Sequence, residues 1–117
     1  MTPGEMKKRT KRFGLDIILL IETLGNSLAA RIISGQLIRA ATSVGANYRA
    51  ACRGRTKREF IAKLGIVEEE ADESAYWLEM LIDAKLVTEA KVTRLIKEAN
   101  ELVAITAASF MTAQKIH

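Results

Sequence analysis

Three kinds of side chain in this sequence have types and spacing suited to chemistry: a cluster of cations, a run of carboxylates and a single thiol. The cations are Arg49, Arg53, Arg55, Lys57 and Arg58. They fall within ten residues, and Glu59 is the only acidic residue near them. Cations gathered in this way bind phosphates, and each phosphate contact adds to the salt dependence of nucleic-acid binding. The cluster therefore indicates a surface for RNA or DNA.

Two other interpretations of this basic cluster stay open. The cluster is a solubilising corner, or it pairs with the acidic face of another subunit. The aromatic residues nearby, Tyr48 and Phe60, both fall on core positions of the helical pattern described below. Base stacking therefore has little support in the sequence.

The carboxylates gather in one run, Glu68, Glu69, Glu70, Asp72 and Glu73. Helical proteins that hold two iron ions combine carboxylates with Glu-x-x-His pairs, but the only histidine of this chain is His117. Zinc-site spacing, a P-loop and a dinucleotide-type glycine loop are also missing from the sequence. We expect a solvated acidic face, or a partner for Arg and Lys across an interface, and no metal or cofactor. A metal-dependent enzyme is the most distant alternative.

The single thiol belongs to Cys52, which has no second cysteine to pair with. Such a chain suits a reducing cytoplasm, and we expect Cys52 to be a small buried hydrophobe in a helix. A nucleophilic cysteine needs a nearby base, as do the hydroxyls of Ser43 and Ser74, and the sequence offers none. We therefore predict no catalytic residue and no enzyme activity.

Composition decides which elements must position these groups. The chain has 117 residues, 49% of them hydrophobic, with one Pro and seven Gly, and this favours helices over a many-stranded β protein. Helical apolar stripes run through residues 13–24, 28–51, 60–82 and 92–110. Long helices joined by short connections pack as antiparallel neighbours. We predict one all-α domain spanning residues 1–117, an antiparallel up-and-down four-helix bundle.

Two of these stripes carry further local signals. The second includes Leu28 and Ile32 among its expected core positions, and its small residues around Gly45 predict the close approach of another backbone. The third begins with Thr56 and Glu59. This pair is a capping box, in which the hydroxyl and the carboxylate each satisfy an unpaired backbone amide.

The N-terminal residues are strongly basic. We expect residues 1–10 to begin the chain as a basic, flexible arm that adds auxiliary phosphate contacts. These contacts are Lys7, Lys8, Arg9, Lys11 and Arg12. The apolar stretch in residues 17–21 is only five residues long, whereas a secretory signal needs about 7–15 and a membrane span about 20. We therefore expect no signal peptide and no membrane contact.

The predicted third helix carries a second group of residues away from its core line. Ile66 and Trp77 lie about 100–120° from that line at 100° per residue, and Glu70 and Glu73 share their sector. A bundle buries one stripe per helix, so Trp77 needs another environment. Either Trp77 lies in a groove beside the fourth helix, or these four residues form a subunit interface, where Trp is enriched.

The residues from Gln36 to Asp83 stand in a recognisable order. The specific parts are Gln36, Arg39-Ala40 and Ser43-Val44 leading to Asn47, then Glu59-Phe60-Ile61 and the run Glu68-Glu69-Glu70-Ala71-Asp72-Glu73. This order resembles the four-helix-bundle family of 23S rRNA intervening-sequence proteins. The stretch from Lys11 to Ala113 is compatible with that family, and charged and small residues agree in spacing as well as the apolar ones.

The resemblance implies a bacterial protein that assembles as a homopentamer of bundles, with no catalytic residues to carry over. A related bundle is the accessory protein of diversity-generating retroelements, a basic pentamer that associates with nucleic acid and a reverse transcriptase. This sequence departs in one place. Many members follow the asparagine with Ile-Ala-Glu-Gly, whereas Asn47 is followed here by Tyr48-Arg49-Ala50-Ala51. This chain therefore has Ala50 in place of that glutamate, and the corner is more basic than is usual in the family.

The charges divide along the chain. Residues 1–63 hold 13 Lys and Arg against 4 Asp and Glu, whereas residues 64–117 hold 5 against 10. The formal charge of +4 therefore conceals a basic half and an acidic half. We expect a non-enzymatic oligomeric bundle whose basic half binds RNA or DNA weakly. The alternative is a protein-interaction scaffold in which the two halves meet between subunits or bind a partner protein.

Overall fold

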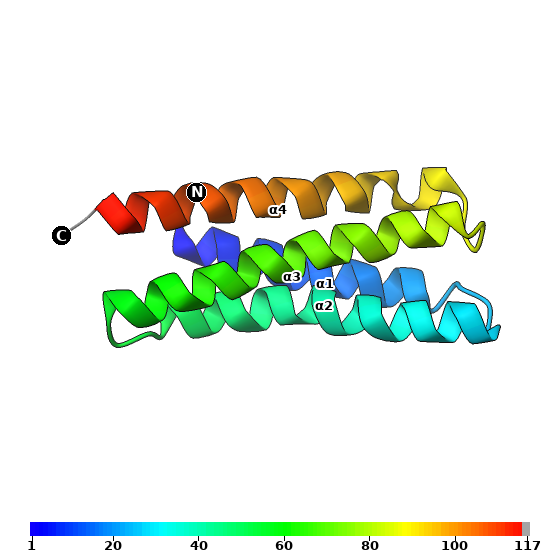
Figure 1. The fold of residues 1–117 in the computed structure, drawn as a ribbon, viewed down its shortest axis with the longest axis horizontal. Helices are drawn as coiled ribbons and strands as arrows, with labels where there is room; N and C mark the ends of the chain where they lie inside the picture. Colours follow the sequence, from blue (N-terminus) through cyan, green and yellow to red (C-terminus); the bar gives the residue numbers. More distant parts are fainter. Residues whose placement is uncertain (116–117) are drawn as a thin grey trace.

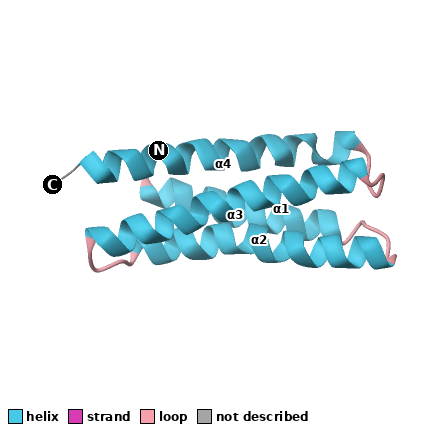
Figure 2. Cartoon of the chain, in the orientation of Figure 1, coloured by secondary structure: helices cyan, strands magenta, loops and turns pink. Residues whose placement is uncertain are grey.

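Four helices make up most of the chain in the computed structural model, which describes residues 1–115. They are α1 (Pro3–Ile21), α2 (Leu28–Cys52), α3 (Lys57–Asp83) and α4 (Glu89–Lys115). No strand occurs among the described residues (Figure 2). The predicted all-α four-helix bundle is confirmed.

The helices run up and down in a rod of 50 × 20 × 19 Å, and each packs against the next one along the chain (Figure 1). α4 returns alongside α1, and that contact is the smallest of the four. The start of α1, the α2–α3 connection and the end of α4 share one end of the rod, called the α2–α3 end below. Within residues 1–115, none of the helices combines the length and the apolar character that a transmembrane span needs.

The core follows the predicted stripes in all four helices. Its largest fully buried side chains include Phe13, Ile17, Leu37, Leu64, Leu78, Leu81 and Leu102. The prediction was wrong for Leu28 and Ile32, which are 65% and 56% exposed. At 100° per residue they lie about 180° and 140° from Leu37, on the outer face of α2. Their apolar character, and not their angle, had placed them in the stripe.

The expected flexible arm at residues 1–10 is also wrong, because α1 begins at Pro3. The Thr2 hydroxyl accepts a hydrogen bond of 3.1 Å from the Glu5 amide, and the Glu5 carboxylate accepts one of 2.9 Å from the Thr2 amide. This is a complete capping box with Pro at the first helical position. Met6 and Thr10 are 4% and 1% exposed, so burial holds the first turns against the bundle.

The close approach predicted near Gly45 is confirmed where α2 meets α1. A Cβ at Gly45 would lie 3.3 Å from the backbone nitrogen of Lys11 and 3.3 Å from the carbonyl carbon of Thr10. A side chain there would push the two helices apart. The absence of a Cβ therefore sets the distance between α1 and α2 at this level of the bundle.

Candidate nucleic-acid interface

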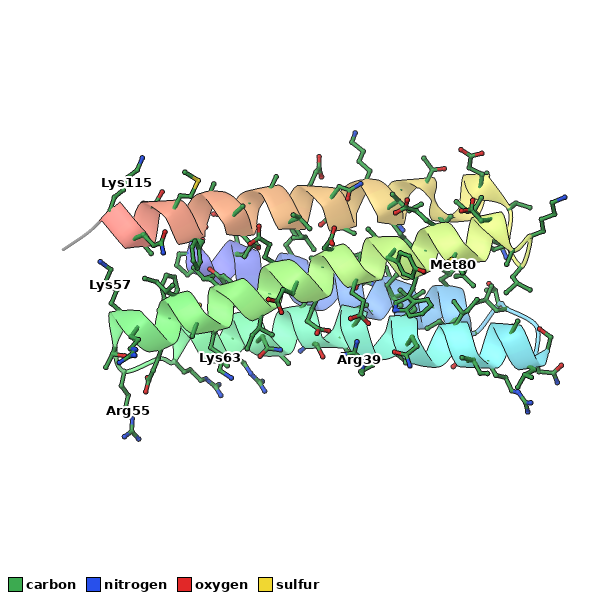
Figure 3. The ribbon with its side chains drawn as sticks, viewed as in Figure 1. Arg39, Arg55, Lys57, Lys63, Met80 and Lys115 are labelled. Atoms are coloured by element: carbon green, nitrogen blue, oxygen red, sulfur yellow. The ribbon has the colours of Figure 1, made fainter. Side chains whose placement is uncertain are left out.

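The structure places the five cations of the basic cluster together at the α2–α3 end. Arg49 lies in the last turn of α2 and Arg53 is the C-cap of that helix. Arg55 lies in the connection, and Lys57 and Arg58 are the first two residues of α3. All five are exposed. None forms a salt bridge with a carboxylate in residues 1–115. Figure 3 shows Arg55 and Lys57 projecting from this end of the rod.

Thr56 and Glu59 organise the connection that carries these cations. The Thr56 hydroxyl caps α3 by accepting a hydrogen bond of 3.1 Å from the Glu59 amide, and the Glu59 carboxylate accepts one of 2.6 Å from the Arg55 amide. Half of the capping box predicted at Thr56 and Glu59 forms, because the carboxylate bonds to the Arg55 amide and not to the amide of Thr56, the N-cap residue. Within residues 1–115, the Glu59 carboxylate forms this bond to a backbone amide and no salt bridge to a cation of the basic cluster.

Four of the five arginines elsewhere on the bundle have carboxylate partners, and Arg31 has none within residues 1–115. Arg9 bonds to Glu98 at 2.7 Å and to Glu101 at 2.8 Å. The hydrogen bond to Glu98 raises the pKa of the Arg9 guanidinium. Arg12 and Arg94 both pair with Asp16, at 2.9 and 3.4 Å. Arg9 and Arg12 are therefore engaged within the chain.

Three other cations of the expected arm stay exposed on α1, namely Lys7, Lys8 and Lys11. These lysines lie in the N-terminal half of α1, which starts at the same end of the rod as the basic cluster. The spacing of Thr2 and Glu5 is the sequence signal that favours a helix, and not a flexible arm, at these lysines. Because α1 is helical from Pro3, Lys7 has a fixed position near the end of α2.

A cavity of about 610 Å³ opens at this end, between parts of all four helices. Its lining includes Lys7, Tyr48, Cys52, Lys57, Phe60 and Ala113.

The two aromatic residues of this lining differ in burial. Tyr48 is 8% exposed, which confirms its predicted core position. Phe60 is half-buried at the edge of the core. Burial, with the neighbouring Cys52 thiol adding to it, raises the pKa of Tyr48 to about 12. The phenol is therefore neutral at physiological pH. Cys52 is half-buried.

The residues predicted as a subunit interface join α3 to α2 of the same chain. The Trp77 indole donates a hydrogen bond of 3.0 Å to Glu73. Arg39 of α2 pairs with Glu73 and, at 3.1 Å, with Glu70. The bonds from Trp77 and Arg39 hold the pKa of Glu73 below its ordinary value. Trp77 thus sits in a network toward α2, not beside α4 as the alternative expectation had it.

Ile66 is the member of this group that the network does not involve. It is 36% exposed and lies about one helical turn before Glu70. Trp77 makes an edge-to-face contact with Tyr76, with ring centroids 5.0 Å apart, and Tyr76 is 53% exposed. The subunit interface stays a prediction, and these two exposed side chains are its remaining candidates on α3.

Of the two serine hydroxyls considered for catalysis, that of Ser74 has a structural partner. The buried Ser74 hydroxyl donates a hydrogen bond of 2.8 Å to the Glu70 carbonyl one turn earlier. Ser43 contributes only its backbone carbonyl, which accepts a hydrogen bond of 2.9 Å from the side-chain amide of Asn47. In the part of the chain that the structure describes, no group of three or more His, Cys, Asp and Glu side chains is placed to hold a metal ion. His117 lies outside the described residues.

Comparison with known proteins gives a family. The sequence pattern of the 23S rRNA-intervening sequence proteins matches residues 4–108. Comparison with curated protein sequences finds no relative. A solved structure from Bacteroides thetaiotaomicron VPI-5482 is similar over 95% of this chain and 99% of its own, with 30% identity and a TM-score of 0.87. That protein is described as one of unknown function from the S23 ribosomal protein family. The chain belongs to the family of 23S rRNA-intervening sequence proteins.

Proposed function

We propose that this protein is a non-enzymatic bundle of the bacterial cytoplasm that self-associates and binds RNA or DNA weakly through its basic cluster. One contrast carries the proposal. Arg9, Arg12, Arg39 and Arg94 pair with carboxylates of the same chain. The cations of the basic cluster are exposed and have no salt-bridge partner within residues 1–115.

Phosphates are the ligand that suits such a surface. Arg49 and Arg53 lie one turn apart on α2 and face the same way. Their guanidinium groups can each bind a phosphate with two parallel hydrogen bonds. Contacts of this kind position a strand without reading its sequence. The family description refers to 23S rRNA, which makes RNA the first ligand to test.

Self-association rests on apolar side chains that the bundle leaves exposed. Ile66 and Tyr76 lie on α3, and Leu19, Leu28 and Ile32 lie on α1 and α2, all of them at least 36% exposed. Burying side chains of this kind favours association. A homopentamer is the state that the family resemblance implies. Light scattering tests it, and a mass equal to one chain would contradict it.

Labelled RNA and DNA titrated at two salt concentrations test the binding surface. We expect binding that weakens with salt and falls in the R53E/R55E variant. The matched control is R31E/K91E, which changes the same charge at the opposite end of the rod, where both cations are exposed. No detectable binding at low salt would reject the proposal.

A second candidate function is a protein-interaction scaffold. The observation that favours it is the outer side of α3, where Glu69, Asp72 and Glu79 are exposed and form no salt bridge within the described chain. The basic cluster of one subunit would then meet this acidic side of another. Dissociation of the oligomer by R53E/R55E, with no loss of nucleic-acid binding, would favour this candidate.

A further inference from the structure

We propose that the cavity at the α2–α3 end takes an unpaired nucleobase of a single-stranded RNA or DNA, with Lys7 and Lys57 contacting the neighbouring phosphates. The inference rests on the proposed function and deepens it, because it names the class of nucleic acid. It also assigns a role to Tyr48 and Phe60, whose core positions in the sequence had argued against stacking.

The lining of the cavity combines apolar and aromatic surface with two cations. Tyr48 comes from α2 and Phe60 from α3, and both line the same opening. Lys7 of α1 and Lys57 of α3 are exposed and contribute to the lining as well. Among the described residues no carboxylate lines the cavity. The cavity volume of about 610 Å³ falls within the range of roughly 300–1,000 Å³ typical of pockets that hold small ligands.

This combination suits one nucleotide better than other anions. A base offers a flat π-face to aromatic side chains, and the phosphates on either side of it offer negative charge to lysines. The neutral phenol of Tyr48 adds no charge that would repel those phosphates. The basic cluster continues from Lys57 through the connection to α2. A strand whose base enters the cavity can therefore continue along the same run of cations.

The inference separates single strands from duplexes. Bases in a duplex are stacked on one another, and a base can enter a side-chain cavity only after unstacking and unpairing, which costs a few kcal/mol. A short unstructured strand pays much less of that cost. The same strand annealed to its complement keeps the phosphates and loses the free bases. An abasic strand keeps the charge and the flexibility and also lacks the bases.

The experiment measures binding of three labelled ligands to the full chain at low salt by fluorescence anisotropy. They are a short unstructured RNA, its duplex, and an abasic strand of equal length. We expect the unstructured RNA to bind about tenfold more tightly than the abasic strand, because stacking of one base on an aromatic side chain is worth about that factor. We expect the F60L variant to lose most of this difference.

F110L is the matched control for that variant. Phe110 in α4 is also half-buried against the core, and it does not line the cavity. The change removes the same aromatic ring, so its effect reports general loosening of the bundle. We expect F110L to keep the preference of the wild-type chain for the unstructured RNA.

The outcomes distinguish this inference from the proposed function. Equal, salt-dependent binding of intact and abasic strands, unchanged in F60L, would leave the proposed function standing and overturn the cavity as a base site. A nucleoside monophosphate that binds as tightly as the strand would overturn the strand as its occupant. No binding of any strand would overturn both. If F60L does not fold, thiouridine-substituted RNA is photocrosslinked to the wild-type chain. Adducts at Tyr48 or Phe60 support the inference, and adducts only at Arg49, Arg53, Arg55 or Arg58, the cluster residues outside the cavity lining, overturn it.

Discussion

Arg9 of α1 donates two hydrogen bonds of 2.7 Å to the carboxylate of Glu98 in α4, one from Nε and one from Nη2. Glu101 accepts a third at 2.8 Å. The pair joins the two helices that share the smallest contact in the bundle. It also joins the basic half of the sequence to the acidic half, so part of the charge division is satisfied inside one chain.

Replacing Arg9 with Gln is expected to lower the free energy of unfolding by about 1–2 kcal/mol, because the part-buried carboxylate of Glu98 and the exposed carboxylate of Glu101 lose a charged partner. Urea unfolding measures the change. R12Q is the control, since Arg12 and Asp16 form an i,i+4 pair worth about 0.3–0.5 kcal/mol. Equal losses in the two variants would contradict a special role for Arg9 between α1 and α4.

Gly45 and Gly65 test the close approach of α1 and α2. Both are helical, but a Cβ at Gly65 meets nothing within 4 Å, whereas one at Gly45 meets the α1 backbone. G65A should raise the free energy of unfolding by about 0.5–1 kcal/mol through helix propensity. Overpacking costs about 1–3 kcal/mol, so we expect G45A to be net destabilising by about 1 kcal/mol in the same urea titration. A gain in G45A equal to that in G65A would show that the helices part freely.

The network around Glu73 predicts a dependence of stability on pH. The indole of Trp77 and the guanidinium of Arg39 bond to this carboxylate, and the pKa of Glu73 is therefore lower in the folded chain than its ordinary value of 4.5. The lowered pKa stabilises the folded chain at pH values above the pKa of Glu73 in the unfolded chain. This stabilisation is lost as the pH falls through the pKa of Glu73 in the folded chain. Stability should decline below about pH 5.

Urea unfolding between neutral pH and about pH 3 checks this decline. We expect the E73Q variant to show a shallower loss of stability on acidification than the wild-type chain. E69Q is the control, because Glu69 is an exposed carboxylate of the same helix without a salt bridge among the described residues. Parallel pH curves for wild type and E73Q would show that Glu73 titrates alike in both states.

Local signals predicted most of the fold, and rotation of the helices about their axes decided the rest. The start of α1 was the exception, because a flexible arm was predicted there although Thr2 and Glu5 stand three residues apart around a Pro. The core prediction was wrong for Leu28 and Ile32 because their apolar side chains were given more weight than their angular positions around the axis of α2. A strict angular reading of α2 assigns both to the outer face.

The candidate site was predictable in part. The clustering of five cations between two helices is a matter of sequence order, and their exposure followed from their polar character. Pairing of Arg39 with Glu73 depends on how α2 is rotated against α3, and the cavity depends on how far the helix ends lie apart at the α2–α3 end. Neither quantity is encoded by the spacing of residues within one helix, so sequence alone did not reveal them.

Ile66 separates self-association from folding. Its side chain is 36% exposed and the network of Arg39 and Glu73 does not include it, so I66D should leave the free energy of unfolding of the isolated chain within about 0.5 kcal/mol. At the proposed interface a buried carboxylate without a partner costs several kcal/mol. We expect light scattering to show a lower mass for I66D and an unchanged mass for M111D, in which a 58% exposed residue of α4 changes. An unchanged mass in I66D would move the interface away from this part of α3.

The salt dependence of binding counts the cations that touch phosphates. Each phosphate contact contributes about 0.7 to the magnitude of the slope of log K against log salt for a single strand, because it releases about 0.7 of a condensed counterion. R49Q/R53Q removes two exposed charges from one face of α2. It should make the salt dependence shallower, lowering the magnitude of the slope by about 1.4. The control R31Q/K91Q lowers the net charge equally at the other end of the rod and should leave the slope unchanged. Equal reductions in both variants would mean that binding responds to net charge alone, and the basic cluster would lose its role as the contact surface.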